Sequence, residues 1–203
     1  LMTTIAFALG VVRLGRRRVL VNELPAIEGL ARVDTVCVDK TGTLTENAMQ
    51  LVEVDIVSGD GTTRDEVDSA LIDLCKLDDR PNATARALLD GLADAGDVVK
   101  HEQTETRPFA SANKWSALTY HGGVTWVFGA PDVLVDDSAV GMQKARQLME
   151  EGLRVLLLAR TSVGADDLPG GALRKSEAVE LEPVALAVLG QKVRSDAAET
   201  VAY

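Results

Sequence analysis

VDTVCVDKTGTLTENAM, from Val33 to Met49, is the stretch that decides the expected fold. Its opening run from Val33 to Val38 is apolar and β-branched, which predicts a buried strand. The run ends on Asp39, and a carboxylate is costly to bury unless something uses its charge. Open α/β sheets bind ligands at the carboxyl ends of their parallel strands. The stretch therefore predicts a parallel strand that presents Asp39 to a ligand.

The residues after Asp39 suit a phosphate ligand. Lys40 supplies an ammonium, Thr41 a hydroxyl, and the glycine and threonine that follow a flexible backbone whose amides can surround phosphate oxygens. In such surroundings a carboxylate can attack a phosphoryl group and hold it as an aspartyl-phosphate. The structural alternative is an N-cap aspartate followed by a turn. The full context DKTGTLTE favours the catalytic interpretation.

Length, composition and charge limit the class of protein. The chain has 203 residues, of which 46% are apolar and 26% charged, as is typical of one or two soluble globular domains. Its net charge of -10 argues against a nucleic-acid partner, because phosphate backbones call for clustered lysine and arginine. Cys37 and Cys75 lack metal-ligand spacing and have apolar neighbours. They predict two buried thiols in a reducing compartment, with a disulfide as the less favoured alternative.

The N-terminus is apolar from Leu1 to Val12 and then basic at Arg16–Arg18. About 20 apolar residues are needed to span a bilayer, so this run is too short. A secretory signal carries its positive charges before the apolar run, whereas here they follow it. The pattern is typical of the end of a membrane helix that emerges beside cytoplasmic arginines. A buried amphipathic helix is the alternative. Because the chain opens on leucine, we interpret it as part of a longer protein.

Helical and strand patterns alternate along the rest of the chain. Apolar residues at helical spacing predict helices, and short β-branched or apolar runs bounded by turn residues predict strands. The expected helices are 63–77, 84–95 and 140–151, the expected strands are 115–120, 124–128, 154–159 and 184–189, and 164–171 is expected to be a loop. The glycines between the first two strands predict a hairpin.

DKTGTLTE, Asp39 to Glu46, resembles the phosphorylation signature of the P-type cation-transporting ATPases. The resemblance implies an α/β fold, in which an incomplete haloacid-dehalogenase-like phosphorylation domain carries an inserted α+β nucleotide-binding domain. It further implies the end of a membrane helix over 1–21, a first phosphorylation-domain piece over 22–50, the insertion over 51–181, and the start of the second piece over 182–203.

Three further stretches are similar to the nucleotide-binding segments of that family. PFASANKWSA, residues 108–117, resembles a segment in which a phenylalanine stacks on adenine and a lysine lines the pocket, here Phe109 and Lys114. FGAPD, residues 128–132, resembles a glycine-alanine-proline turn, which implies a cofactor-binding role for Gly129. GLRVLLLA, residues 152–159, resembles the segment whose arginine reaches the ATP phosphates, here Arg154. Taken singly, Phe109 reads as a core residue and Arg154 as a surface arginine.

The chain departs from the family pattern at three positions. Phe128 stands where the turn is normally preceded by lysine, and Ala85 stands where an acidic residue is often near adenine. Both departures bear on nucleotide affinity. Gln191 stands where aspartate is common, which weakens an assignment of Gln191 and Arg194 to the site.

The resemblance also implies an activity. ATP and Mg²⁺ are the expected cofactors, and the expected reaction is transfer of the γ-phosphoryl group to Asp39, with Lys40 and Thr41 stabilising the transferred group. Asp39 and Thr41 are the expected metal ligands. The parent would be a bacterial ATPase of the translocase class, embedded in the cell membrane by several helices, with this part on the cytoplasmic side. Its partner would be a transported cation, for which we expect calcium.

Two alternatives remain open at this stage. A soluble phosphatase of the same superfamily would usually carry a second aspartate two residues after the nucleophile, where Thr41 stands. Without that acid-base group an aspartyl-phosphate should live longer, as a transport cycle needs. The other alternative is a nucleotide-binding module with no chemistry of its own. Phosphorylation of Asp39 by ATP separates a catalyst from a mere binder.

Overall fold

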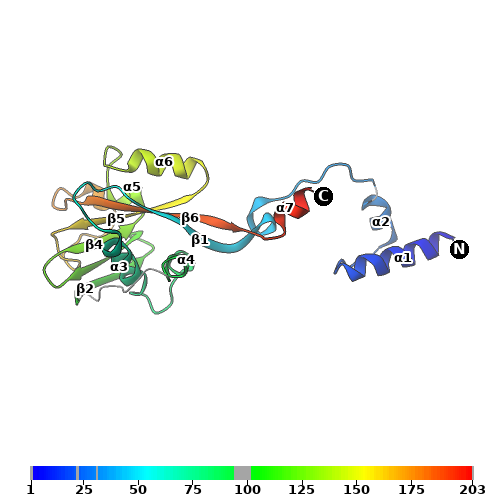
Figure 1. Ribbon diagram of the computed structural model, residues 1–203, viewed down its shortest axis with the longest axis horizontal. Coiled ribbons are helices and arrows are strands. Elements are labelled where there is room, and N and C mark those ends of the chain that lie inside the picture. Colours follow the sequence, from blue (N-terminus) through cyan, green and yellow to red (C-terminus); the bar gives the residue numbers. More distant parts are fainter. Residues whose placement is uncertain (1, 22, 31, 94–101, 203) are drawn as a thin grey trace. The chain divides into compact units, whose positions relative to one another are not determined.

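The computed structural model describes residues 2–21, 23–30, 32–93 and 102–202 (Figure 1). The chain divides into two compact units, Leu1–Lys40 and Thr41–Tyr203. In the first unit, α1 runs over Met2–Arg16 and α2 over Leu24–Leu30. Within the described residues, no helix is both long and apolar enough to cross a membrane.

The strand predicted over 33–38 is not formed. Residues 33–39 have no regular secondary structure, and Val36 is 75% exposed. β-Branched residues favour a pleated, half-buried surface, but an extended segment becomes a strand only where another strand accepts its hydrogen bonds. The described residues of this unit form helices and supply no such partner. The prediction of a parallel strand that carries Asp39 was therefore wrong for this chain.

The second unit is built on a six-stranded sheet with the order β1-β6-β5-β4-β3-β2. Every pair between neighbouring strands of the sheet is antiparallel. The strands are β1 Thr45–Ile56, β2 Gln103–Ala110, β3 Trp115–Tyr120, β4 Thr125–Gly129, β5 Arg154–Thr161 and β6 Glu182–Val193. β2 to β5 therefore form a meander, and the first strand of the unit pairs with the last.

Helices cover both faces of this sheet. One face of the sheet is covered by α3 Arg64–Cys75 and α4 Ala83–Gly91, and we call the cluster of buried side chains between them and the sheet the first core. The other face is covered by α5 Pro131–Leu134, α6 Met142–Glu150 and the short 3-10 helix η2 Leu173–Lys175, which enclose the second core. Alternation along the strands divides the side chains between the two, because successive residues point to opposite faces. Leu118 lies in the first core and Ala117 in the second. A π-helical turn, η1 Lys40–Leu44, precedes β1, and α7 Ala197–Ala202 follows β6.

Local sequence signals explain where the two helices of the first core begin. Thr63 caps α3 through a capping box with Glu66, whose carboxylate accepts a hydrogen bond from the Thr63 amide at 2.8 Å. The side chain of Asn82 caps α4 by accepting a hydrogen bond from the Ala85 amide at 3.0 Å. The predicted helix over 84–95 is shorter than expected and ends at Gly91. Its predicted stop, Gly96, lies outside the described residues.

Two further outcomes concern the strands and the cysteines. The predicted hairpin is confirmed as β3 and β4, but β1 and β2 were not predicted. β1 continues unbroken across residues 50 and 51, and the predicted division of the chain there stays a prediction. The expectation of two buried thiols was wrong for Cys37, which is exposed because its predicted strand does not form. Cys75 is buried on α3, and both thiols are free.

Candidate nucleotide-binding site

The antiparallel meander brings together ends of strands that are far apart in the sequence. β2 ends, β3 begins, β4 ends and β5 begins at the same end of the sheet, because neighbouring strands run in opposite directions. All four predicted cofactor-binding residues lie at these points and line one cavity of about 690 Å³: Phe109, Lys114, Gly129 and Arg154. Cavities of roughly 300–1,000 Å³ are typical of small-molecule sites.

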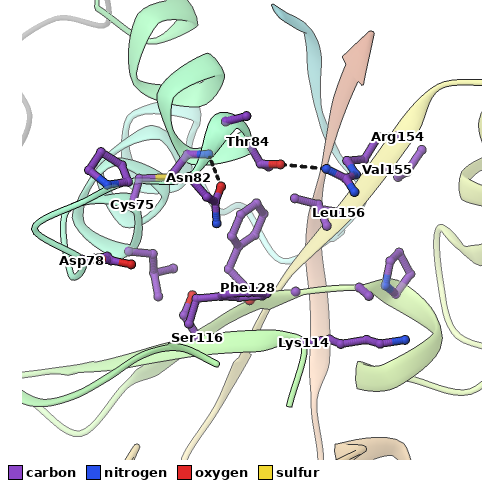
Figure 2. A pocket seen from close by; sticks show the side chains of 18 of the residues that line it. Cys75, Asp78, Asn82, Thr84, Lys114, Ser116, Phe128, Arg154, Val155 and Leu156 are labelled. Carbon is purple, nitrogen blue, oxygen red and sulfur yellow. Dashed lines mark hydrogen bonds between the residues drawn. The ribbon is translucent and has the colours of Figure 1, made fainter. Parts of the chain in front are cut away.

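Figure 2 shows the side chains that line the cavity; we call the apolar part of this lining the floor and the polar part the rim. The floor includes Leu74, Cys75, Phe128 and Leu156, and the rim includes Asn82, Thr84 and Ser116. Charges of both signs complete the lining, namely Asp78, Asp132, Lys114 and Arg154. Such a lining suits a ligand with a flat apolar part and an anionic part.

Phe109 supplies the exposed aromatic group of the site. It lies one residue before the end of β2 and is 45% exposed, although a large apolar side chain gains free energy from burial. Its neighbours in β2 are also exposed or half-buried, because β2 is an edge strand. The ring can therefore stack on a flat ligand, as an aromatic face does on a base.

Lys114 occupies a strained position in the turn between β2 and β3. Its φ of 61° is in the left-handed region, which residues other than glycine rarely adopt. The carbonyl oxygen of Ala110 accepts hydrogen bonds from the amides of Asn113 and Lys114, at 3.0 and 2.8 Å, and so closes the turn. The turn places the exposed Lys114 side chain at the cavity.

Gly129 lies directly opposite this turn, and its role there is one of close approach. A Cβ atom at Gly129 would stand 2.6 Å from the Lys114 carbonyl oxygen and 2.6 Å from the Trp115 Cβ. The amide of Ala130 donates a hydrogen bond to the same Lys114 oxygen at 3.2 Å. Only a residue without a side chain lets the end of β4 come this near to β3.

Arg154 begins β5 and joins it to α4 across the cavity rim. Its Nη1 donates a hydrogen bond to Thr84 Oγ1 at 2.9 Å, which Figure 2 marks with a dashed line, and lies 3.6 Å from Met49 Sδ. A guanidinium has five N–H donors, so Arg154 can keep Thr84 and still bind an anion. Sequence reasoning did not find Thr84, because 70 residues separate the two partners.

Two positions that depart from the family pattern also lie on the cavity wall. Phe128 is only 7% exposed, and Figure 2 shows its ring directed from β4 toward the first turn of α4. Ala85 lies in that first turn and lines the same cavity. Cys75 contributes to the floor, and its burial raises the pKa of the thiol to about 12. The thiol is therefore neutral at physiological pH.

The predicted catalytic residues lie at the junction of the two units. Asp39 belongs to the first unit and is exposed. Lys40 and Thr41 begin η1, and their side chains lie outside what the structure describes. Beyond η1, the Thr45 hydroxyl donates to Gln191 Oε1 at 3.3 Å, and Arg194 pairs with Asp196 at 3.0 Å. The Thr45–Gln191 contact joins the start of β1 to the last residues of β6, whereas the Arg194–Asp196 pair lies beyond the end of β6.

Asp39 and Thr41 are the predicted metal ligands. The described residues contain no cluster of three or more His, Cys, Asp or Glu side chains that could hold a metal ion. Mg²⁺ usually takes only one or two protein carboxylates and completes its shell with phosphate oxygens and water. The exposed carboxylate of Asp39 fits a Mg²⁺ ion that arrives with a nucleotide.

Comparison with known proteins agrees with the expected family. The calcium-transporting ATPase CtpE of Mycobacterium bovis is 49% identical over 206 aligned residues, which cover 100% of this chain and 24% of the relative. The chain is a homologue of the P-type cation-transporting ATPases. CtpE of Mycolicibacterium smegmatis is 47% identical and the probable cation-transporting ATPase exp7 of Streptococcus pneumoniae 32% identical, each over 100% of this chain. The chain thus spans about a quarter of the length of these P-type ATPases.

A solved P-type ATPase confirms the fold. The crystal structure of a zinc-transporting PIB-type ATPase superposes with a TM-score of 0.72 at 20% identity, over 98% of this chain and 28% of that chain. No protein-family model matches the chain. The mixed helix and strand architecture is therefore that of the matched part of a PIB-type ATPase.

Proposed function

We propose that this chain is the cytoplasmic catalytic part of an ATP-driven cation pump in the cell membrane, and that ATP bound in the cavity donates its γ-phosphoryl group to Asp39. One observation carries the proposal. The nucleotide-binding residues expected from three separate sequence stretches converge on a single cavity of about 690 Å³. Phe109 stacks on the adenine, whereas Lys114 and Arg154 bind the phosphates as cations.

In the transfer step, an Asp39 carboxylate oxygen attacks the γ-phosphorus in line. The new bond joins that oxygen to phosphorus, and the bond from phosphorus to the β–γ bridging oxygen breaks, its electron pair leaving with ADP. Mg²⁺, when bound, neutralises charge on the phosphoryl oxygens. Lys40 and Thr41 stabilise the transferred group. Because Thr41 stands where a phosphatase has its acid-base aspartate, the aspartyl-phosphate persists long enough to drive transport.

We infer calcium as the transported cation because relatives that are 47–49% identical over the whole chain are named calcium-transporting. A graft tests the chemistry and its coupling to calcium transport together. The chain replaces the matching region of the Mycolicibacterium smegmatis ATPase, and membranes that carry the graft are given radioactive ATP. We expect acid-stable labelling and ATP-dependent calcium uptake into vesicles. Labelling without calcium uptake would show that the grafted chain is phosphorylated but does not drive calcium transport.

Substitution of the nucleophile in that graft tests Asp39. Asp39→Asn should abolish the labelling, because an amide is a far poorer nucleophile than a carboxylate. Asp34→Asn is the matched control, since Asp34 is an exposed aspartate five residues upstream in the same irregular segment. Labelling that survives Asp39→Asn, or disappears equally in both variants, would reject the assignment of Asp39.

The 203-residue chain tests the binding step by itself. We expect it to bind ATP without sustained hydrolysis, as a nucleotide-binding module does, because the whole cavity lies in the unit Thr41–Tyr203. Phe109→Ala should weaken ATP and adenosine alike by about 1–3 kcal/mol, which is the cost of losing one base-on-aromatic stack. Calorimetry that finds unchanged affinity removes Phe109 from the site. Release of phosphate from simple phosphate esters would instead favour the phosphatase alternative.

A further inference from the structure

The segment Gly164–Gly171, which we call the strap, was expected to be a plain loop. In the structure it has no helix or strand, but several of its residues pack into the second core or form hydrogen bonds with the sheet. Ala165 and Leu168 are 0% and 3% exposed and lie in the second core together with Trp115. A segment that buries apolar side chains in this way is held by packing rather than free in solvent.

Polar contacts fasten the first half of the strap to the edge of the sheet. The amide of Ala165 donates to Thr119 Oγ1 at 2.9 Å, and the amide of Asp166 donates to Glu105 Oε2 at 3.2 Å. From β2, the Arg107 guanidinium donates to the Leu168 carbonyl oxygen and lies 4.7 Å from the centre of the Trp115 ring. The strap is thus tied to both β2 and β3.

The last residue of the strap grips the turn that carries Lys114 from both sides. The amide of Gly171 donates to Asn113 Oδ1 at 3.0 Å, and Trp115 Nε1 donates to the Gly171 carbonyl oxygen at 2.8 Å. Asn113 and Trp115 are the two chain neighbours of Lys114. One residue of the strap therefore fixes the residues on either side of the cavity lysine.

These two hydrogen bonds can hold the turn in its strained conformation. A residue other than glycine with a φ of 61° has a backbone conformation that costs free energy, and it persists only where surrounding contacts offset that cost. If the grip is lost, the Lys114 backbone can relax toward negative φ, and the ammonium then moves from its place at the cavity. Neither Asn113 nor Trp115 lines the cavity, so an effect of these residues on a ligand is indirect, and Lys114 is the lining residue that lies between them in the chain.

We propose that the strap Gly164–Gly171 is a positioning element for Lys114, and that Asn113 and Trp115 set the affinity for the phosphate part of the nucleotide without touching it. The proposal rests on the proposed function, since it takes Lys114 to be a phosphate ligand. It assigns a role in nucleotide selectivity to a segment more than 50 residues further along the chain.

The test uses the 203-residue chain with ATP and adenosine as paired probes. Trp115→Phe keeps a buried ring and removes the indole N–H, and Asn113→Ala removes the other grip without emptying the core. In each variant the Kd for ATP should rise about fivefold, the worth of one hydrogen bond, whereas the Kd for adenosine should change less than twofold. Trp126→Phe is the matched control, because Trp126 is a buried tryptophan of the first core that does not line the cavity.

A second background shows whether the effect passes through Lys114. In Lys114→Met, which keeps most of the length of the side chain but not its charge, Trp115→Phe should leave the ATP affinity unchanged. An equal loss of ATP and adenosine binding, or a fivefold effect that persists in Lys114→Met, would overturn the positioning role. If Lys114→Met weakens ATP binding but Trp115→Phe and Asn113→Ala leave the Kd for ATP unchanged, only the strap proposal is rejected. If Lys114→Met itself has no effect on ATP, the phosphate role of Lys114 falls, and the strap proposal with it.

Discussion

At the scale of single residues, the cavity has an uncharged aromatic side chain, Phe128, where the resembled family has a cation. The ring lines the cavity together with Cys75 and Leu156, at a position where the resembled family has lysine. Two cations, Lys114 and Arg154, remain at the rim to attract a triphosphate. The floor can add apolar contact to the base or ribose but no charge for the phosphates. We therefore expect adenosine, ADP and ATP to bind with more similar affinities here than in relatives with that lysine.

Phe128→Lys should restore a preference for ATP over adenosine. The gain should be largest at low ionic strength, because salt screens the attraction between an ammonium and a triphosphate. The variant should also lower the free energy of unfolding by about 2–4 kcal/mol, since it replaces a buried ring by a side chain that must reach the cavity to keep its charge solvated. Titration of both ligands at two salt concentrations measures the preference. Phe128→Met is the uncharged control, and an identical preference in native chain and lysine variant contradicts this account.

The two cysteines should differ sharply in reactivity. Burial raises the pKa of the Cys75 thiol to about 12, so the reactive thiolate is scarce at pH 8, whereas Cys37 is exposed. We expect an alkylating reagent to modify Cys37 in the folded chain and Cys75 only after denaturation. Mass spectrometry of the digested protein reports both sites. Equal rates of modification in the native chain would show that Cys75 is accessible.

At the scale of elements, the sequence predicted those elements that carry their own signals. α3 was found because its apolar residues recur at helical spacing, and the hairpin of β3 and β4 because glycines separate two apolar runs. β2 was missed because it is an exposed edge strand with Pro108, a pattern that looks like a loop. The prediction of a strand over 33–38 was wrong for the opposite reason. It has strand composition, but strand formation depends on a partner that composition does not reveal.

The pairing of β3 with β4 should depend on Gly129. Gly129→Ala places a Cβ within 3 Å of the backbone at Lys114 and Trp115, so the two strands must move apart. We expect the free energy of unfolding to fall by about 1–3 kcal/mol, as in overpacked cores, and ATP affinity to fall with it. Thermal unfolding and calorimetry measure these effects. Gly59→Ala is the control, because a Cβ there meets nothing within 4 Å. Equal stability of the two variants contradicts the close-approach role.

At the scale of the whole molecule, the cavity and the residue expected to be phosphorylated belong to different units of the chain. All four predicted cofactor-binding residues lie in the unit Thr41–Tyr203, and Asp39 lies in the other. The sequence could name these four because each sits in a stretch that resembles a family segment. It could not show Thr84 or the strap, because their contacts join residues about 50–70 positions apart and carry no local pattern.

Removal of residues 1–40 tests this division. The remaining unit contains the whole sheet, both cores and the cavity, so its melting temperature and its Kd for ATP should match those of the longer chain within measurement error. Calorimetry and thermal unfolding compare the two. A truncated chain that unfolds, or that loses ATP binding, would show that the first unit supports the second. The two-unit description would then be wrong in energetic terms.

The pairing of the first strand of the second unit with its last has a mechanical consequence. Thr45 lies opposite Val193, so the chain enters the sheet at β1 and leaves it at β6 side by side. A force that pulls these ends apart acts across the strands and loads the β1–β6 hydrogen bonds one after another, as in opening a zipper. A load along the strands would instead strain all the bonds of the ladder at once. The unit should therefore yield to tension at its two ends more easily than its thermal stability suggests.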